Sequence, residues 1–342
     1  MKKINNLNEK KKYDKYFNYM NVIYKVFTFI ILIILIHKLR KTLEAIDKNN
    51  KAEQIEKEKE KSQKIIKNPY YSLDLSGKIL FMRHGQTFFN EDKDYKSRRI
   101  KEKYIDCKLS REGIKQAKSK QRVLNKLKIE KVYVSPLYRA LQTLTYSLEK
   151  HPDRKNIVAF VHPLVSESAN CVNDYILNIK QTKKDFNMKS KIKINWTLFY
   201  KYVKGIKYNE NFFYFDNLDN MDIGEKSKMY KKLKTYYDNG EIKKYKKGLV
   251  ELAKMTLDSK KYFESLKKSH ERFINFMRYI KKKYSKTLAN KNKKILVFSH
   301  GSFMTGGTNF TPYKNKNLQK FHPKCHTPKN CEIISYNILN IK

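Results

Sequence analysis

From Gly77 onward, short apolar runs alternate with longer stretches in which apolar residues recur at helical spacing. The short runs are rich in β-branched and aromatic residues, which is typical of buried strands. We expect strands over residues 79–82, 131–134, 157–161, 295–298 and 333–339. The clearest helical spacing covers residues 262–283, and another helix is expected to begin after Ser110. This alternation predicts a three-layer α/β/α sandwich with a mostly parallel sheet.

One interval, from about residue 172 to 258, breaks the alternation. It is rich in Lys, Tyr, Asn and Phe, and it shows no regular succession of strands and helices. We interpret it as an insertion into a domain that spans residues 77–342. At this length the insertion should carry structure of its own, such as a partly helical cap, or else be partly disordered.

The N-terminal part of the chain has a different pattern. A basic tail, residues 1–21, precedes a hydrophobic segment, residues 22–39, and a charged linker follows over residues 40–76. The hydrophobic segment favours an uncleaved, single-pass signal anchor that tethers the domain to a membrane. A secretory or organelle-directing leader that is later removed, and a buried core helix, are the alternatives. The side of the membrane on which the domain would lie stays open.

The net charge of the 342-residue chain, +43, favours anionic partners such as phosphorylated substrates, acidic lipid or nucleic acid. Only ten of the 76 basic residues are arginines, however, and the lysines are spread along the whole chain. This distribution indicates a solvated surface with a compositional bias. We therefore do not expect a nucleic-acid partner.

The four cysteines are too few for a disulfide scaffold. Cys325, His326 and Cys331 lie close together, but their spacing differs from that of structural zinc sites. A single disulfide between Cys325 and Cys331 is the alternative to a fortuitous cluster. No metal site is predicted.

Residues suited to chemistry follow the ends of the predicted strands. Arg83 and His84 follow the first strand, His300 follows the strand at 295–298, and Arg139 and Glu167 follow two others. Because the C-terminal ends of parallel strands meet at one edge of a sheet, these side chains should converge. Two guanidinium groups and one imidazole would neutralise a phosphoryl group, while the other imidazole attacks phosphorus and the carboxyl group protonates the leaving oxygen. The set predicts phosphoryl transfer without a cofactor.

Short blocks of sequence surround these residues in a fixed order. They are Arg83-His84-Gly85-Gln86-Thr87 with Asn90; Asp106 and Leu109-Ser110 with Gly113 and Gln116-Ala117; Ser135-Pro136-Leu137 with Arg139-Ala140 and Gln142-Thr143; Pro163-Leu164 with Glu167; Ser299-His300-Gly301; and Asn330-Cys331. Together they resemble the histidine phosphatase superfamily, in its phosphoglycerate-mutase-like branch. The resemblance covers Gly77 to Leu339 in outline, and the interval of about 172–258 matches none of it.

The resemblance implies a role for each matching residue. His84 would be the phosphorylated nucleophile, and Glu167 would be the general acid and later the base for water. The residues that would hold the phosphoryl group or line its pocket are Arg83, Arg139, His300 and Asn90. Asp174 is the alternative general acid.

The resemblance also leaves two reactions open. Residues 91–105 lack the aromatic and glycine-containing segment with which glycolytic mutases of this family grip phosphoglycerate. We therefore expect a membrane-tethered phosphatase that hydrolyses phosphate monoesters, with a phosphorylated small molecule or phosphoprotein as its substrate. Phosphoglycerate mutase-type transfer, and a catalytically inactive member that binds anionic partners, are the alternatives.

Overall fold

The computed structural model describes residues 20, 28–29, 32, 35–44, 46–47, 71–72, 75, 77–258, 263–285, 292–308 and 326–336. The chain divides into two compact units, Met1–Lys67 and Asn68–Lys342. In the first unit residues 35–44 are helical, and Arg40 Nε donates to Glu44 Oε1 at 3.1 Å, one turn along the helix. The second unit carries the sheet.

The predicted signal anchor over residues 22–39 is wrong. Among the residues that the structure describes, no helix is long and apolar enough to cross a membrane. Several positions within 22–39 lie outside the described residues. The uninterrupted apolar run from Val26 to Ile36 is also only about half of the ~20 residues that a spanning helix needs. The predicted membrane tether, and the membrane location that it implied, are therefore wrong as well.

A sheet of seven strands forms the centre of the second unit within its described residues. In spatial order the strands are β1 (Tyr71–Ser72), β7 (Ile333–Tyr336), β2 (Ile79–Arg83), β6 (Lys293–Ser299), β3 (Lys128–Val134), β4 (Val158–Val161) and β5 (Lys193–Asn195). The strands from β2 to β5 in this order run parallel, and β7 pairs antiparallel with β1 and β2. Five of these strands match the sequence expectation, whereas β1 and β5 are too short to leave a pattern.

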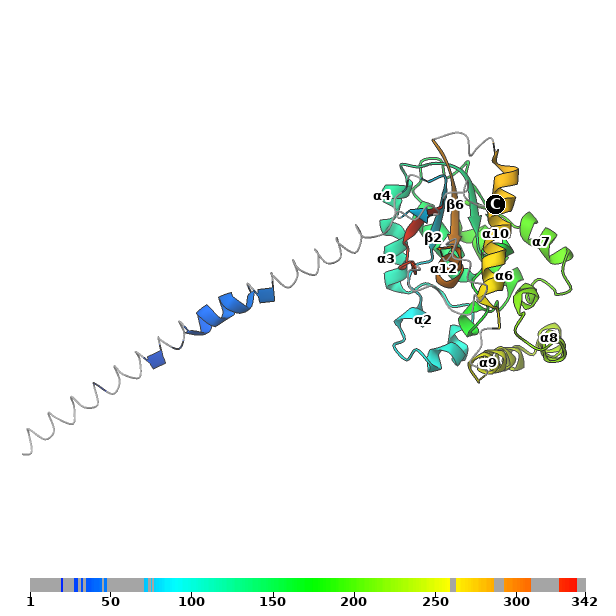
Figure 1. The fold of residues 1–342 in the computed structure, drawn as a ribbon, viewed down its shortest axis with the longest axis horizontal. Coiled ribbons are helices and arrows are strands. Elements are labelled where there is room, and N and C mark those ends of the chain that lie inside the picture. The colour runs from blue at the N-terminus through cyan, green and yellow to red at the C-terminus, as the bar shows by residue number, and fades with distance from the viewer. Residues whose placement is uncertain are drawn as a thin grey trace, which may run out of the picture. The chain divides into compact units, whose positions relative to one another are not determined.

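Helices cover both faces of this sheet, which gives the expected three layers (Figure 1). One face packs against α3 (Arg111–Ser119), α4 (Gln121–Leu124) and α5 (Tyr138–Leu148). The other packs against α10 (Leu266–Lys283) and α12 (Gly301–Thr308). Alternate residues of a strand point to opposite faces, so Leu80 and Met82 join one core cluster while Ile79 and Phe81 join the other. Burial on both faces is the reason for the continuous apolar run in β2.

Short helical turns occupy the loops between these elements. They are α2 (Phe88–Glu91), η1 (Ser97–Ile100), η2 (Glu102–Tyr104), η3 (Pro163–Val165) and η4 (Val172–Asp174). The first three lie in the loop after the C-terminal end of β2, and η3 and η4 lie in the loop after the C-terminal end of β4. The loops at this edge of the sheet are therefore partly ordered by turns of helix.

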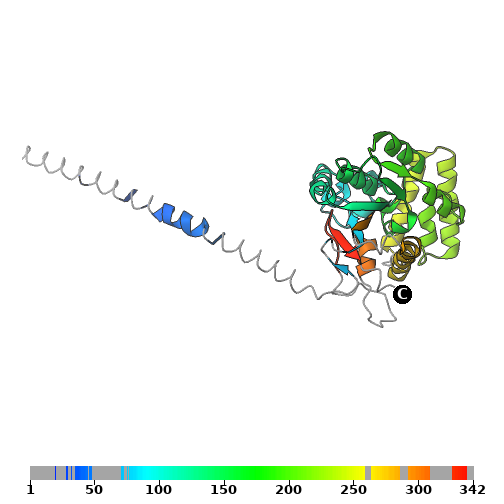
Figure 2. The same ribbon diagram turned by 90° about the horizontal axis from the view of Figure 1, so that it is seen from above.

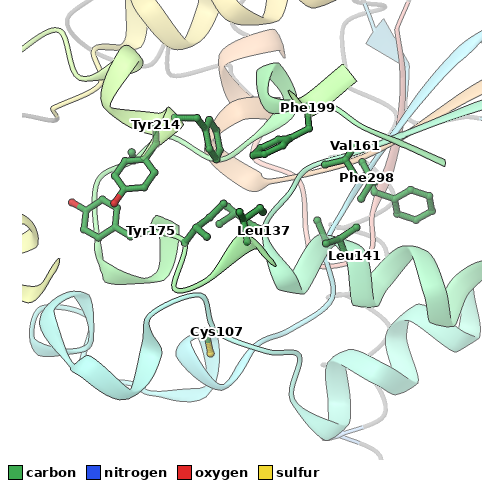
Figure 3. Packing of buried hydrophobic residues seen from close by; sticks show 14 of the residues in the cluster. Cys107, Leu137, Leu141, Val161, Tyr175, Phe199, Tyr214 and Phe298 are labelled. Atoms are coloured by element: carbon green, nitrogen blue, oxygen red, sulfur yellow. The ribbon is translucent and has the colours of Figure 1, made fainter. Parts of the chain in front are cut away.

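The interval from 172 to 258 is folded and largely helical. After η4 its elements are α6 (Ile179–Lys189), β5, α7 (Thr197–Lys204), η5 (Phe213–Asn217), α8 (Ile223–Asp238) and α9 (Ile242–Asp258). Tyr175 stacks on Tyr214 with ring centroids 5.1 Å apart, in the same core cluster as Leu137 and Phe199 (Figure 3). Helices α8 and α9 lie side by side (Figure 2), and α9 packs against η1, η2 and η4. The interval thus reaches the loops that follow β2.

Candidate functional site

The parallel register of β2 and β6 brings two histidines together. It pairs Arg83 with Ser299, so His84 and His300 follow at the same level of the sheet. The backbone N–H of His84 donates to the Ser299 carbonyl at 3.0 Å, and the two imidazole rings lie 5.2 Å apart between centroids. Both side chains are buried. The structure therefore brings together the ends of the strands predicted at 79–82 and 295–298.

The hydrogen bonding of His84 defines which ring nitrogen is available. Its Nδ1 lies 2.7 Å from the carbonyl oxygen of Gly85. Because a carbonyl oxygen only accepts, Nδ1 carries the proton and Nε2 keeps its lone pair. Burial, followed by the positive charges of Arg139 and Arg83, lowers the pKa of His84 well below its ordinary value. The imidazole is therefore neutral and suited to nucleophilic attack through Nε2.

Two glycines let the loop after His84 lie directly on the first turn of α3. A Cβ on Gly85 would be 2.5 Å from the Gly113 carbonyl oxygen, and a Cβ on Gly113 would be 1.9 Å from the carbonyl oxygen of Gln86. Such distances are shorter than any ordinary contact, so neither position can carry a side chain without a shift of the backbone. The Gly85 N–H donates to Thr143 Oγ1 of α5 at 3.0 Å, which fixes the loop from the other side.

Arg139 lies in the first turn of α5 with its side chain only 1% exposed. Its Nη2 donates to Asp174 Oδ1 at 3.0 Å, and its Nη1 donates to the Asn173 carbonyl. Burial raises the pKa of Asp174 to about 6, although the Arg139 charge acts in the opposite direction. The turn η4 thus holds Arg139 in one orientation.

Arg83 and His300 are held from the other side of the site. Arg83 Nη1 donates to the Pro328 carbonyl at 2.6 Å, and a Cβ on Gly301 would be 3.1 Å from Arg83 Nε. The absence of a side chain at Gly301 therefore lets the guanidinium lie across the first turn of α12. His300 Nε2 and Ser135 Oγ lie 2.7 Å apart, and burial lowers the pKa of His300 well below its ordinary value.

Three buried polar atoms of this group have no hydrogen-bond partner among the described residues. They are Arg83 Nε, Arg139 Nε and His300 Nδ1. Buried polar groups in proteins are nearly always satisfied, and exceptions often mark functional sites. Arg139 and both histidines are buried, Arg83 is partly buried beside them, and the positive charges of Arg139 and Arg83 both act on His84. An oxyanion is the ligand that matches this arrangement.

Glu167 lies beside the site, at the N-terminus of α12. Its Oε1 accepts from the backbone N–H groups of Ser168 and Phe303, both at 3.0 Å, and its Oε2 accepts from the Ser302 N–H at 3.2 Å. Its charge acts on Arg83 and on Asp174. The side chain is partly exposed, so solvent and a ligand can reach it.

Asn90 has a local role in the structure. Its Oδ1 accepts from the Thr87 N–H at 3.1 Å and from Thr87 Oγ1 at 3.0 Å, so the two residues form the capping box of α2. This arrangement orders the turn that follows Gln86. The phosphate-lining role of Asn90 stays a prediction.

Several supporting residues carried no role in the sequence interpretation. Thr143 and Asn330 belong to the blocks quoted above, yet only the fold shows that Thr143 Oγ1 accepts from Gly85 and that Asn330 Nδ2 donates to the His84 carbonyl at 3.1 Å. The carbonyls of Asn173 and Pro328, which orient the arginines, have no sequence signature. Cys331 is a buried free thiol, and Cys325 lies outside the described residues. Among the described residues no His, Cys, Asp and Glu side chains form a group that could hold a metal ion.

Comparison with known proteins gives one family match and two curated relatives, each over a part of the chain. Residues 79–161 match the histidine phosphatase superfamily (branch 1). The 2,3-bisphosphoglycerate-dependent phosphoglycerate mutase 2 of Latilactobacillus sakei is 35% identical over 74 residues, which are 21% of this chain and 30% of the mutase. The corresponding mutase of Chlamydia pneumoniae is 30% identical over 77 residues, 22% of this chain and 31% of the mutase. The chain thus spans about a third of the length of the curated relatives it matches.

Solved structures also match the chain, at low sequence identity and low TM-score. A mycobacterial glucosyl-3-phosphoglycerate phosphatase is 12% identical with a TM-score of 0.39, covering 76% of this chain and 96% of the phosphatase. A phosphoglycerate mutase from Bacillus anthracis is 15% identical with a TM-score of 0.36, covering 77% of this chain and 93% of the mutase. The match over residues 79–161 and the two mutase relatives support the histidine phosphatase superfamily, in its phosphoglycerate-mutase-like branch, as the family of this chain.

Proposed function

We propose that this protein hydrolyses phosphate monoesters through a phosphohistidine intermediate on His84. The observation that carries the proposal is the group of unpartnered, buried donors beside His84. Arg83 Nε, Arg139 Nε and His300 Nδ1 are buried without a partner among the described residues. A phosphoryl group would satisfy these donors and neutralise the buried positive charge.

The first step transfers the phosphoryl group to the enzyme. His84 Nε2 attacks phosphorus, a nitrogen–phosphorus bond forms, and the bond between phosphorus and the ester oxygen breaks. The leaving oxygen takes a proton from Glu167 and departs as an alcohol. The hydrogen bond from His84 Nδ1 to the Gly85 carbonyl stabilises the positive charge that the imidazole gains. The two arginines and His300 stabilise the charge on the equatorial oxygens.

The second step regenerates the enzyme. Water attacks the phosphohistidine while Glu167, now a carboxylate, takes its proton. The nitrogen–phosphorus bond breaks, inorganic phosphate leaves, and His84 and Glu167 return to their starting states. Each full cycle consumes one ester and one water and yields one alcohol and one phosphate.

Two carboxyl groups compete for the acid role, and their surroundings favour Glu167. Asp174 is buried, and its Oδ2 already accepts from the N–H groups of Asn170 and Cys171 and from Cys171 Sγ, while its Oδ1 accepts from Arg139. Glu167 is partly exposed, and its Oε2 accepts one backbone N–H, so a lone pair can carry the proton. We assign Asp174 to the orientation of Arg139.

Mutase-type transfer is the second candidate, because the two relatives, which match 21% and 22% of this chain, are named phosphoglycerate mutases. A mutase must return the phosphoryl group to a bound phosphoglycerate and keep water away. Residues 91–105 lack the aromatic and glycine-containing segment that the family resemblance implies for glycolytic mutases. Hydrolysis is therefore favoured.

The test uses the full chain and a panel of phosphate monoesters that includes phenyl phosphate, 4-nitrophenyl phosphate and 3-phosphoglycerate. We expect phosphate release that persists with a chelator and is lost in His84→Ala, while circular dichroism shows the variant to be folded. An alkaline quench of labelled substrate should trap a phosphoenzyme in the wild type. Release that survives in His84→Ala would overturn the proposal. Conversion of 3-phosphoglycerate to 2-phosphoglycerate without release of phosphate would favour the mutase.

A further inference from the structure

A buried ion pair lies behind the candidate site and has no part in the steps above. Arg272 of α10 and Glu264, just before that helix, are 3% and 1% exposed. Arg272 Nε donates to Glu264 Oε1 at 2.5 Å, and Arg272 Nη2 donates to Glu264 Oε2 at 3.0 Å. This two-point geometry is the strongest form of ion pair between these residue types. Neither residue belongs to a block that resembles the family.

The pair is bonded to the loop that carries Glu167, on both sides of that residue. Arg272 Nη1 donates to the carbonyls of Leu164 at 2.8 Å and Ser166 at 3.2 Å. Glu264 accepts a hydrogen bond from the backbone of Ala169. The ion pair therefore holds the chain immediately before and after Glu167.

The same guanidinium also contacts the helix turn that receives the Glu167 carboxylate. Arg272 Cζ lies 4.9 Å from the ring centroid of Phe303, and the Phe303 N–H donates to Glu167 Oε1 at 3.0 Å. A second link runs from Ser299 Oγ, which donates to the Val165 carbonyl at 2.7 Å. Arg272 thus contacts both the loop that carries Glu167 and Phe303, whose N–H binds the Glu167 carboxylate. The relative position of this loop and Phe303 sets the direction of the Glu167 side chain.

We propose that the Arg272–Glu264 pair is a positioning device that sets the Glu167 carboxyl group for proton transfer to the leaving oxygen. The inference rests on the proposed function, because it assigns Arg272 an effect through the acid role of Glu167. Arg272 is a positioning residue and does not touch the substrate. Burial of an ion pair costs solvation energy, whereas burial of two apolar side chains does not. Orientation of the loop gives a reason for two charged residues at this buried position.

The test compares two aryl phosphates of similar shape whose leaving groups differ in their need for a proton. Phenolate is a poor leaving group and requires protonation, whereas 4-nitrophenolate departs as the anion. Loss of a positioned acid should therefore slow phosphoryl transfer from phenyl phosphate and leave transfer from 4-nitrophenyl phosphate nearly unchanged. Glu167→Gln serves as the reference. We compare kcat/KM, which reports the transfer to His84 and not the later attack of water, and we expect Glu167→Gln to lower it by about 100-fold for phenyl phosphate and by less than about 5-fold for 4-nitrophenyl phosphate.

The variant for the ion pair is the double substitution Glu264→Gln with Arg272→Met, which removes both charges and leaves no buried charge without a partner. We expect this double variant to show the same selectivity as Glu167→Gln, with a loss of about 30-fold for phenyl phosphate and of less than about 5-fold for 4-nitrophenyl phosphate. In the Glu167→Gln background the same double substitution should cause no further selective loss. Arg272→Lys, which keeps the charge but loses the fork, should show a smaller loss of the same selectivity.

Ile280→Val is the matched control, since Ile280 lies buried in the core on the same helix and its side chain carries no charge and no hydrogen-bonding group. It should lower stability and leave the ratio of the two rates unchanged. Equal losses on both substrates in the double variant, or a selective loss that adds to that of Glu167→Gln, would overturn the inference. If the double variant does not fold, the ratio in Arg272→Lys decides the question. Activity that survives in His84→Ala would instead remove the proposed function, whatever the ratio.

Discussion

The imidazole rings of His84 and His300 lie 5.2 Å apart, although the two residues come from opposite ends of the folded domain. The parallel register of β2 and β6 sets this distance, because it pairs Arg83 with Ser299 directly before them. Both rings are buried beside Arg83 and Arg139, and burial together with these positive charges lowers the pKa of each histidine well below its ordinary value. Two neutral imidazoles beside two arginine side chains suit a nucleophile and a hydrogen-bond donor to phosphate.

The lowered pKa of His84 predicts activity that persists in acid. An ordinary histidine loses half of its nucleophilic form near pH 6.5. His84 stays neutral below that pH, because burial and then the positive charges of Arg139 and Arg83 lower its pKa well below the ordinary value. We expect kcat/KM for 4-nitrophenyl phosphate to stay within about 3-fold between pH 7 and pH 5, after correction for ionisation of the substrate. A fall with a midpoint near 6.5 would contradict this expectation.

Asp174→Asn should weaken both stability and catalysis through Arg139. The substitution leaves the buried guanidinium without the carboxylate that lies 3.0 Å away, at a cost of about 3 kcal/mol in the free energy of unfolding. A misplaced guanidinium should also lower kcat/KM by about 100-fold, equally for phenyl phosphate and 4-nitrophenyl phosphate. A loss confined to phenyl phosphate would instead make Asp174 the proton donor.

Asp185→Asn is the control for that substitution. Asp185 Oδ2 accepts from the hydroxyl of Tyr138, the residue next to Arg139, at 3.2 Å. The exchange removes a carboxylate from the same neighbourhood without touching Arg139. Both rates should stay within about 2-fold of the wild type.

The raised pKa of Asp106 predicts that the stability of the protein depends on pH. Burial raises the pKa of this carboxyl to about 6, and its Oδ1 accepts from the Tyr138 N–H at the start of α5. Between the unfolded pKa near 4 and the folded value, the native state binds a proton that the unfolded state lacks, so stability from this group falls as pH rises through 6. Asp106→Asn keeps the acceptor and the left-handed backbone, with φ of 47°, but cannot ionise.

We therefore expect Asp106→Asn to gain about 3 kcal/mol relative to the wild type between pH 4 and pH 7. Urea unfolding at the two pH values measures this difference. A constant difference between variant and wild type across the range would show that Asp106 does not titrate in the native state.

Gly113→Ala should displace the loop that carries His84. The added Cβ would lie 1.9 Å from the Gln86 carbonyl oxygen, so the backbone of α3 or of the loop must move. We expect a loss of about 3 kcal/mol in the free energy of unfolding and of at least about 100-fold in kcat/KM. Gly205→Ala is the control, because its Cβ would meet the Tyr202 carbonyl oxygen at 3.4 Å, an ordinary contact. Equal effects of the two substitutions would contradict the tight approach at Gly113.

Prediction from sequence failed for the N-terminal hydrophobic segment and for the interval from 172 to 258. The run from Val26 to Ile36 is apolar enough to indicate a signal anchor, but length decides whether a helix spans, and no described helix reaches it. Strand β5 has three residues and lies in the interval from 172 to 258, so no alternation could reveal it. The helices of that interval are held by aromatic contacts such as Tyr175 on Tyr214, which follow no sequence period.

The sequence by itself determined five of the seven described strands and the residues at the edge of the sheet. A strand buried on both faces must be a continuous apolar run, and the polar residues that follow such runs meet when the strands are parallel, so Arg83, His84 and His300 could be predicted to converge. Only the tertiary structure decided how these groups are oriented. Asp174 and Asn173 hold Arg139, and Arg272 holds the Glu167 loop, through contacts between loops far apart in the chain. Such contacts depend on how loops pack in three dimensions, and packing between distant loops leaves no periodic mark in the sequence.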